Sequence, residues 1–103
     1  MGAYQTTIAY QTKSSTVSSS VVGISDAGWS WTTGYVALAE RAVITSRSAG
    51  VMVRWDGGDP TSTLGHLISQ NGTLEILGMD NIANLKFIRE SGADAVVSIT
   101  LEK

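Results

Sequence analysis

The chain has no cysteine, one proline and one histidine among its 103 residues. The absence of cysteine excludes a disulfide framework, a thiolate metal site and a cysteine nucleophile, and it suits assembly in a reducing compartment. No apolar run approaches the roughly 20 residues of a membrane-spanning helix, and residues 1–13 lack the apolar stretch of a secretory signal. We therefore expect a soluble chain with no membrane contact and no targeting segment.

Charged side chains are also scarce. They make up 16% of the residues, against roughly 25% in an ordinary globular domain. Seven basic and nine acidic side chains give a net charge of −2, which leaves no excess of cations to neutralise a phosphate backbone. We therefore expect no nucleic-acid partner. Within residues 1–39, only Lys13 and Asp26 are charged.

This opening segment carries hydroxyl groups in place of charge, since sixteen of the chain's 24 serines and threonines precede residue 50. One interpretation is that the serine-rich residues 12–20 are disordered. The other is a strand, because Tyr4, Ile8 and Tyr10 lie on one parity of the sequence. A strand with so few charges is poorly protected against edge-to-edge pairing. We therefore expect a partner chain to cover this segment, with residues 1–38 used in assembly either as an arm or as edge strands.

The rest of the chain favours short strands over helices. Residues 36–42 contain good helix formers but run into the β-branched residues 43–45, so we interpret them as strand. The strands expected further on cover residues 51–55, 66–69, 73–77, 85–90 and 95–102. Asn71-Gly72 and residues 91–94 each predict a hairpin between the strands that flank them. Between the two hairpins, Asp80 is expected to cap one helical turn through residues 81–84.

The pattern predicts a single all-β domain over residues 1–103. The expected class is an antiparallel β-sandwich or a jelly-roll-like barrel of about seven to nine short strands. A second sheet is required because Val97, Ile99 and Leu101 form an apolar face that must be covered. A chain of this size hides only about 60 to 65% of its unfolded surface, so the core is thin.

No arrangement of residues points to catalysis, and we expect neither an enzyme nor a cofactor. His66 is the only histidine and no Gly-x-Ser-x-Gly sequence is present, so a structural histidine at a strand start is favoured. Asp56 and Asp59 lie three residues apart in a glycine-bent loop. That spacing suits either a side-chain-capped turn or a calcium site, but the ligand series of an EF-hand is missing. We favour the turn and expect no metal.

Aromatic residues suggest a further candidate site. Trp29 and Trp31 would project from the same face if residues 28–32 were extended, with Tyr35 close behind. Such a row can fill a core, anchor a contact between subunits or stack on a sugar. The charge-poor surroundings suit a protein contact better than a sugar groove. The residues expected at an interface are Tyr4, Ile8, Tyr10, Trp29, Trp31 and Tyr35.

Four segments carry a resemblance to a known group of proteins. They are Arg54-Trp55-Asp56-Gly57-Gly58-Asp59-Pro60-Thr61, Gly65-His66-Leu67-Ile68, Asp80-Asn81-Ile82-Ala83-Asn84-Leu85 and Ile88-Arg89. In these segments the chain resembles small β-rich structural proteins of tailed bacteriophages, over roughly residues 39 to 103. The motifs are those of turns and strands and contain no catalytic residue.

The resemblance implies a structural component of the virion, assembled in the host cytoplasm. The role that it favours is a capsid decoration or cement protein, and a tail or adaptor position is an alternative. The implied partners are copies of the same chain and the major capsid protein. Asp56, Asp59, Pro60 and His66 would then brace a loop. A carbohydrate-binding module that uses Trp29, Trp31 and Tyr35 is the remaining alternative.

Overall fold

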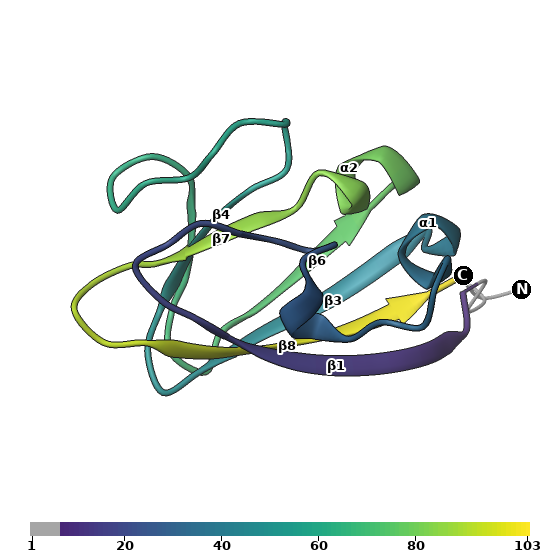
Figure 1. The fold of residues 1–103 in the computed structure, drawn as a ribbon, viewed down its shortest axis with the longest axis horizontal. Helices are drawn as coiled ribbons and strands as arrows, with labels where there is room; N and C mark the ends of the chain where they lie inside the picture. Colours follow the sequence, from purple (N-terminus) through teal and green to yellow (C-terminus); the bar gives the residue numbers. More distant parts are fainter. Residues whose placement is uncertain (1–6) are drawn as a thin grey trace, which may run out of the picture.

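The computed structural model describes residues 7–103, in which eight strands form two four-stranded antiparallel sheets packed face to face (Figure 1). Sheet I contains, in order, β1 (Ala9–Val17), β8 (Ala95–Glu102), β3 (Arg41–Arg47) and β6 (Thr73–Leu77). Sheet II contains, in order, β2 (Val22–Gly23), β7 (Lys86–Arg89), β4 (Val51–Arg54) and β5 (His66–Ile68). The connections hold three helical turns, η1 (Ala27–Trp29), α1 (Tyr35–Leu38) and α2 (Met79–Ala83). The expected all-β sandwich is confirmed.

The order of the strands defines a jelly roll. β1 pairs with β8, β2 with β7, β3 with β6 and β4 with β5. The chain thus runs as one long hairpin that is wound into two sheets, which is the jelly-roll arrangement. Consecutive strands change sheets at every connection except the one between β4 and β5.

The two predicted hairpins are wrong because the strands on either side of each turn lie in different sheets. A tight turn does form at Asn71, whose φ is 66°, and the Gly72 amide donates to the Ser69 carbonyl at 2.7 Å. However, β5 before the turn belongs to sheet II and β6 after it belongs to sheet I. β7 and β8 are divided between the sheets in the same way. Positive φ fixes a turn but not the sheet that the next strand joins.

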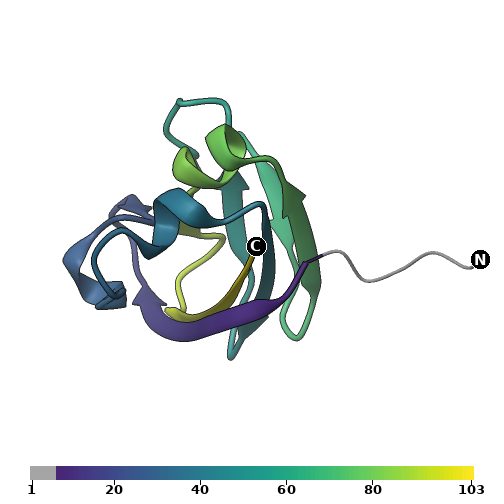
Figure 2. The ribbon, with the colours of Figure 1, turned by 90° about the vertical axis from the view of Figure 1, so that its right-hand side faces the viewer.

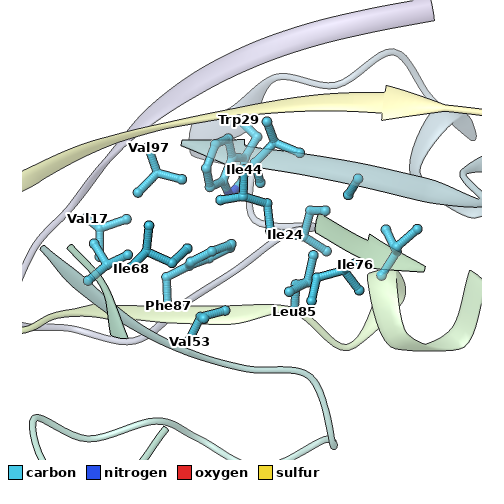
Figure 3. Close-up of a cluster of buried hydrophobic side chains, with 14 of the residues drawn as sticks. Val17, Ile24, Trp29, Ile44, Val53, Ile68, Ile76, Leu85, Phe87 and Val97 are labelled. Carbon is cyan, nitrogen blue, oxygen red and sulfur yellow. The ribbon is translucent and has the colours of Figure 1, made fainter. Parts of the chain in front are cut away.

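The core lies between the sheets and is built from alternating residues. In β8, the expected inward residues Val97, Ile99 and Leu101 are fully buried while their neighbours are partly exposed. Phe87 of sheet II is also fully buried, and its ring centroid lies 5.9 Å from that of Trp29. Figure 3 shows side chains from both sheets meeting in this interior. The period of two therefore identifies the buried face correctly.

The helical turns differ from the expectations at two places. Residues 36–42 are not one strand, because Tyr35–Leu38 form a helical turn and β3 begins only at Arg41. This turn follows Gly34, whose positive φ of 84° reverses the chain before the helix formers. The turn expected near residues 81–84 exists as α2, but Asp80 does not cap it. Gly78 occupies the N-cap position without a side-chain hydrogen bond.

The serine-rich segment is ordered strand as far as Val17, and Tyr4 lies outside the described residues. The chain from η1 to α1 then lies against the side of the sandwich next to β1 (Figure 2). Gln11 holds it there, since its side chain exchanges two hydrogen bonds with Thr32, at 3.0 and 3.1 Å. None of the helices among residues 7–103 is long and apolar enough to cross a membrane.

Candidate functional site

The first expected interface residues lie at one end of β1. Ile8 exchanges backbone hydrogen bonds with Lys103, at 2.8 and 3.0 Å, and its side chain is 73% exposed. Tyr10 is half-buried, and its hydroxyl donates to the Tyr35 carbonyl at 2.6 Å. The two tyrosine rings meet edge to face at 5.2 Å. Burial raises the pKa of the Tyr10 phenol, and the neighbouring Tyr35 adds to the rise. Ile8 is thus free for a contact, while Tyr10 and Tyr35 mainly bind each other.

The two tryptophans do not form an extended row. Ser30 between them has a φ of 57°, so the backbone reverses after η1 and brings the indole rings together. The rings stack with centroids 6.1 Å apart and planes 16° from parallel. Trp29 is 1% exposed and donates its Nε1 proton to the Gly23 carbonyl, while Trp31 donates to Ile24. Trp29 is therefore a core residue of the single chain, and Trp31 is the half-buried member of the pair.

Trp31 also lines a surface cavity of about 400 Å³ beside η1. Five polar residues share the lining with it: Ser25, Asp26, Ser30, Thr32 and Thr33. Trp29 is not among the lining residues, which fits its position behind Trp31. The cavity thus offers one aromatic ring, several hydroxyls and one carboxylate.

A larger feature is the outer face of sheet I. Cross-strand pairs of hydroxyls lie on it: Thr12 with Thr100 at 2.8 Å, Ser14 with Ser98 at 2.7 Å and Thr45 with Thr73 at 3.4 Å. The ion pairs of this face lie toward one end, where Arg41 binds Glu75 at 2.9 Å and Glu102 at 3.1 Å. Arg47 lies exposed at the other end of β3, so the hydroxyl-rich area without ionic side chains is the part of the face between these charges. Sequence reasoning noted the hydroxyls but missed the pairs, because their members lie up to 88 residues apart.

The loop after β4 brings the four expected loop residues into one region. Arg54 binds both oxygens of Asp56, at 3.0 and 2.7 Å, and donates to the Asp59 carbonyl at 3.1 Å. Lys86 reaches the Asp59 carboxylate at 3.0 Å, and Pro60 is buried. His66 stacks on Trp55 with ring centroids 4.7 Å apart. This geometry holds the loop against sheet II.

The two hydrogen bonds from the Arg54 guanidinium also change the pKa of Asp56. These hydrogen bonds to the carboxylate, helped by the Gly58 amide, lower the pKa of Asp56 from 3.8 to about 2. Because the folded pKa lies below the unfolded one, the resulting stabilisation is present above about pH 4. It is lost as the pH falls through the folded pKa of about 2.

We therefore expect the Asp56 side-chain carboxyl to titrate with a midpoint near 2 in a carbon-13 NMR experiment. In the variant Arg54→Gln, the midpoint should rise toward the ordinary value of 3.8, since the largest cause of the shift is removed. A midpoint near 3.8 in the unmodified chain, or an unchanged midpoint in the variant, would show that the Arg54 guanidinium does not bind the Asp56 carboxylate in solution.

The same loop offers little for catalysis or metal binding. Asp56 faces Arg54 and Asp59 faces Lys86, so cations of the chain already neutralise the two carboxylates that a calcium site would use. Within residues 7–103, no group of three or more His, Asp and Glu side chains is placed to hold a metal ion. His66 contacts an indole, and in the same range no serine or threonine hydroxyl hydrogen-bonds to it. The arrangement therefore suits residues that hold the loop after β4 in place.

Comparisons of the chain with protein-family models, with curated proteins and with solved structures found no match.

Proposed function

We propose that this chain is a structural component of a phage virion, a capsid decoration or cement protein that binds copies of itself and the major capsid protein. It has no catalytic role and no cofactor in this proposal, and it resides in the virion after assembly in the host cytoplasm. The observation that carries the proposal is the hydroxyl-rich area of the outer face of sheet I, which lies beside its long edge strand β1 and between the charged residues Arg41 and Arg47.

Surface chemistry supports this role. The hydroxyl-rich area of this face loses less hydration energy than a charged surface when another protein covers it, because no charge within that area has to be buried. Serine and threonine hydroxyls can donate or accept, so they adapt to the polar groups of a partner. The jelly roll also occurs in viral capsid and lectin domains, although a fold by itself does not define a function.

The mechanism would be thermodynamic. Apolar surface buried between neighbouring subunits stabilises the shell by about 25 cal/mol per Å². Lost rotational and translational freedom reduces this gain. Many copies binding a repeating shell would offset that loss, because attachment of one subunit positions its neighbours. The exposed Ile8, Leu38, Leu77 and Met79 are available for such burial.

Fractionation of phage particles tests the location. A tagged copy of the chain is expressed in infected host cells, and capsid shells and tails are separated on a density gradient. We expect the chain to co-purify with capsid shells. Recovery with tails would support the tail or adaptor alternative, and recovery with neither would contradict a virion role. An unrelated tagged protein of the same size controls for trapping.

A carbohydrate-binding module stays a second candidate because of the cavity beside Trp31. An aromatic ring with neighbouring hydroxyls and a carboxylate is suited to a sugar ring. A fluorescence response of the unmodified chain to added glycans would favour the second candidate, whereas protection of the tryptophans only upon self-assembly would favour the structural role. Trp31→Phe removes the indole and its hydrogen bond to the Ile24 carbonyl, so it should weaken glycan binding measured by calorimetry.

A further inference from the structure

The four edge strands of the two sheets are very unequal in length. Among residues 7–103, β2 has two residues, β5 has three and β6 has five, while β1 has nine. Short edges protect a sheet against pairing with another chain. β1 is the exception, and Figure 1 shows it along the lower part of the molecule. The chain from η1 to α1 contacts β1, but among residues 7–103 no backbone-to-backbone hydrogen bond joins the two.

The hydrogen-bond pattern shows which groups of β1 are unpaired. The Glu102 carbonyl accepts the Glu40 amide on the β3 side, so the alternate residue Leu101 faces β1. Leu101 pairs with Gln11, and the register continues with Lys13 and Ser15. The backbone groups of the residues between these pairs must point away from the sheet. Those residues are Thr12, Ser14 and Thr16, and all three are exposed.

We propose that this free edge pairs with the β1 strand of a second copy, antiparallel, about a two-fold axis through Ser14. The inference rests on the self-association in the proposed function and specifies its contact. In this register Ser14 pairs with Ser14 of the second copy, and Thr12 pairs with its Thr16. All three free residues then hydrogen-bond across the axis, which extends sheet I into a continuous sheet of two subunits.

Charge selects this register over its neighbour. Moving the axis by one residue, to Lys13, would place the two lysines directly opposite each other, which is unfavourable. With the axis at Ser14, Lys13 faces Ser15 of the second copy instead. Lys13 has the parity of the core-facing residues, since it pairs with the buried Ile99. An inward-pointing charge is a known protection against indiscriminate edge pairing, so it favours one specific partner over open-ended association.

The irregularity at the start of β1 limits the pairing in length. The register shifts between Ala9 and Gln11, which marks a β-bulge. Bulges twist a strand away from the plane in which a neighbour would pair. The regular part of β1 is thus the segment from Gln11 to Val17, with Ser14 at its centre. A symmetric contact requires a centre of this kind.

Disulfide trapping tests the register directly, because the chain has no cysteine of its own. Residues paired at a two-fold axis have Cα atoms about 5.5 Å apart, which is within the range of a disulfide. We expect oxidised Ser14→Cys to be recovered as a covalent dimer. Thr12→Cys and Thr16→Cys should each stay largely monomeric alone, but cross-link to each other when mixed. Efficient self-linking at Thr16, or none at Ser14, would overturn the proposed register.

A proline variant tests the edge without a covalent bond. Ser14→Pro removes an amide that bonds to no other segment among the described residues, so the subunit should still fold. Thr73→Pro is the matched control, since the Gly72 carbonyl bonds to Ser46 and Thr73 therefore faces the opposite free edge. In sedimentation, with folding checked by circular dichroism, Ser14→Pro should lose the dimer and Thr73→Pro should keep it.

The two proposals fail in different ways. An unmodified chain that stays monomeric at high micromolar concentration contradicts self-association itself. An oligomer that persists in Ser14→Pro, with no disulfide in Ser14→Cys, contradicts only the pairing through β1. Loss of the dimer in Thr73→Pro as well as in Ser14→Pro would also reject this edge as the specific contact.

Discussion

Replacing Phe87 with alanine is expected to lower the free energy of unfolding by about 3–5 kcal/mol. The side chain is fully buried between the sheets and packs against Trp29, with ring centroids 5.9 Å apart. Alanine would lose the transfer free energy of the ring and leave a cavity that the two sheets fill only in part. Small domains unfold with about 5–15 kcal/mol, so this one change removes a large share of the total.

Urea unfolding followed by circular dichroism measures the effect. Leu67→Ala is the control, since Leu67 lies on β5 of the same sheet but is 52% exposed. It should cost less than about 1 kcal/mol, because it loses little buried surface. Equal losses in the two variants would mean that the interior is not organised around Phe87.

The buried face of β8 was predictable from the sequence. Its expected inward residues Val97, Ile99 and Leu101 are fully buried and alternate with partly exposed neighbours. In β4, by contrast, the three consecutive residues 51–53 are all buried. A period of two follows directly from strand geometry, and burial of one face is the largest favourable term in folding. Local sequence therefore carries this information well.

The pairing of strands was not predictable in the same way. Asn71-Gly72 indicates a turn whether the chain returns along the same sheet or crosses to the other one. The choice depends on which sheet must cover the apolar face of β8, and that is a property of the complete domain. In a jelly roll, most partners are distant in the chain, as with Lys13 and Ile99. Sequence patterns read over short windows do not contain these pairs.

The candidate surface was likewise predictable from the sequence only in part. The low charge of the opening segment was visible in the sequence, and it drew attention to the segment that contains β1. What the sequence did not show is that the backbone groups of Thr12, Ser14 and Thr16 share an edge on which no other described segment hydrogen-bonds to them. It also did not show that Trp29 turns inward, because that depends on the left-handed conformation of Ser30. Non-glycine residues adopt this conformation only when the surrounding structure requires it.

Gly65→Ala is expected to lower the free energy of unfolding by about 1–3 kcal/mol. Gly65 precedes β5 with a φ of +140°, a conformation that L side chains rarely adopt. An added Cβ would lie 3.0 Å from the Val53 carbonyl oxygen, which belongs to the buried strand β4 and has little freedom to move. Backbone strain and crowding therefore act together at this site.

The matched control is Gly92→Ala, where an added Cβ meets no atom within 4 Å and no positive φ is involved. That variant should change the free energy of unfolding by no more than a few tenths of a kcal/mol, and a small gain is possible because alanine restricts the unfolded chain. The Arg54 loop should respond only to Gly65→Ala, because Gly65 lies next to Arg54, whose Cγ is 3.5 Å from the added Cβ. The Asp56 titration midpoint should then rise from about 2. If Gly65→Ala were as stable as Gly92→Ala, the close approach of Gly65 to β4 would not exist in solution. The position of Arg54 beside Gly65, from which it binds Asp56, would then be contradicted as well.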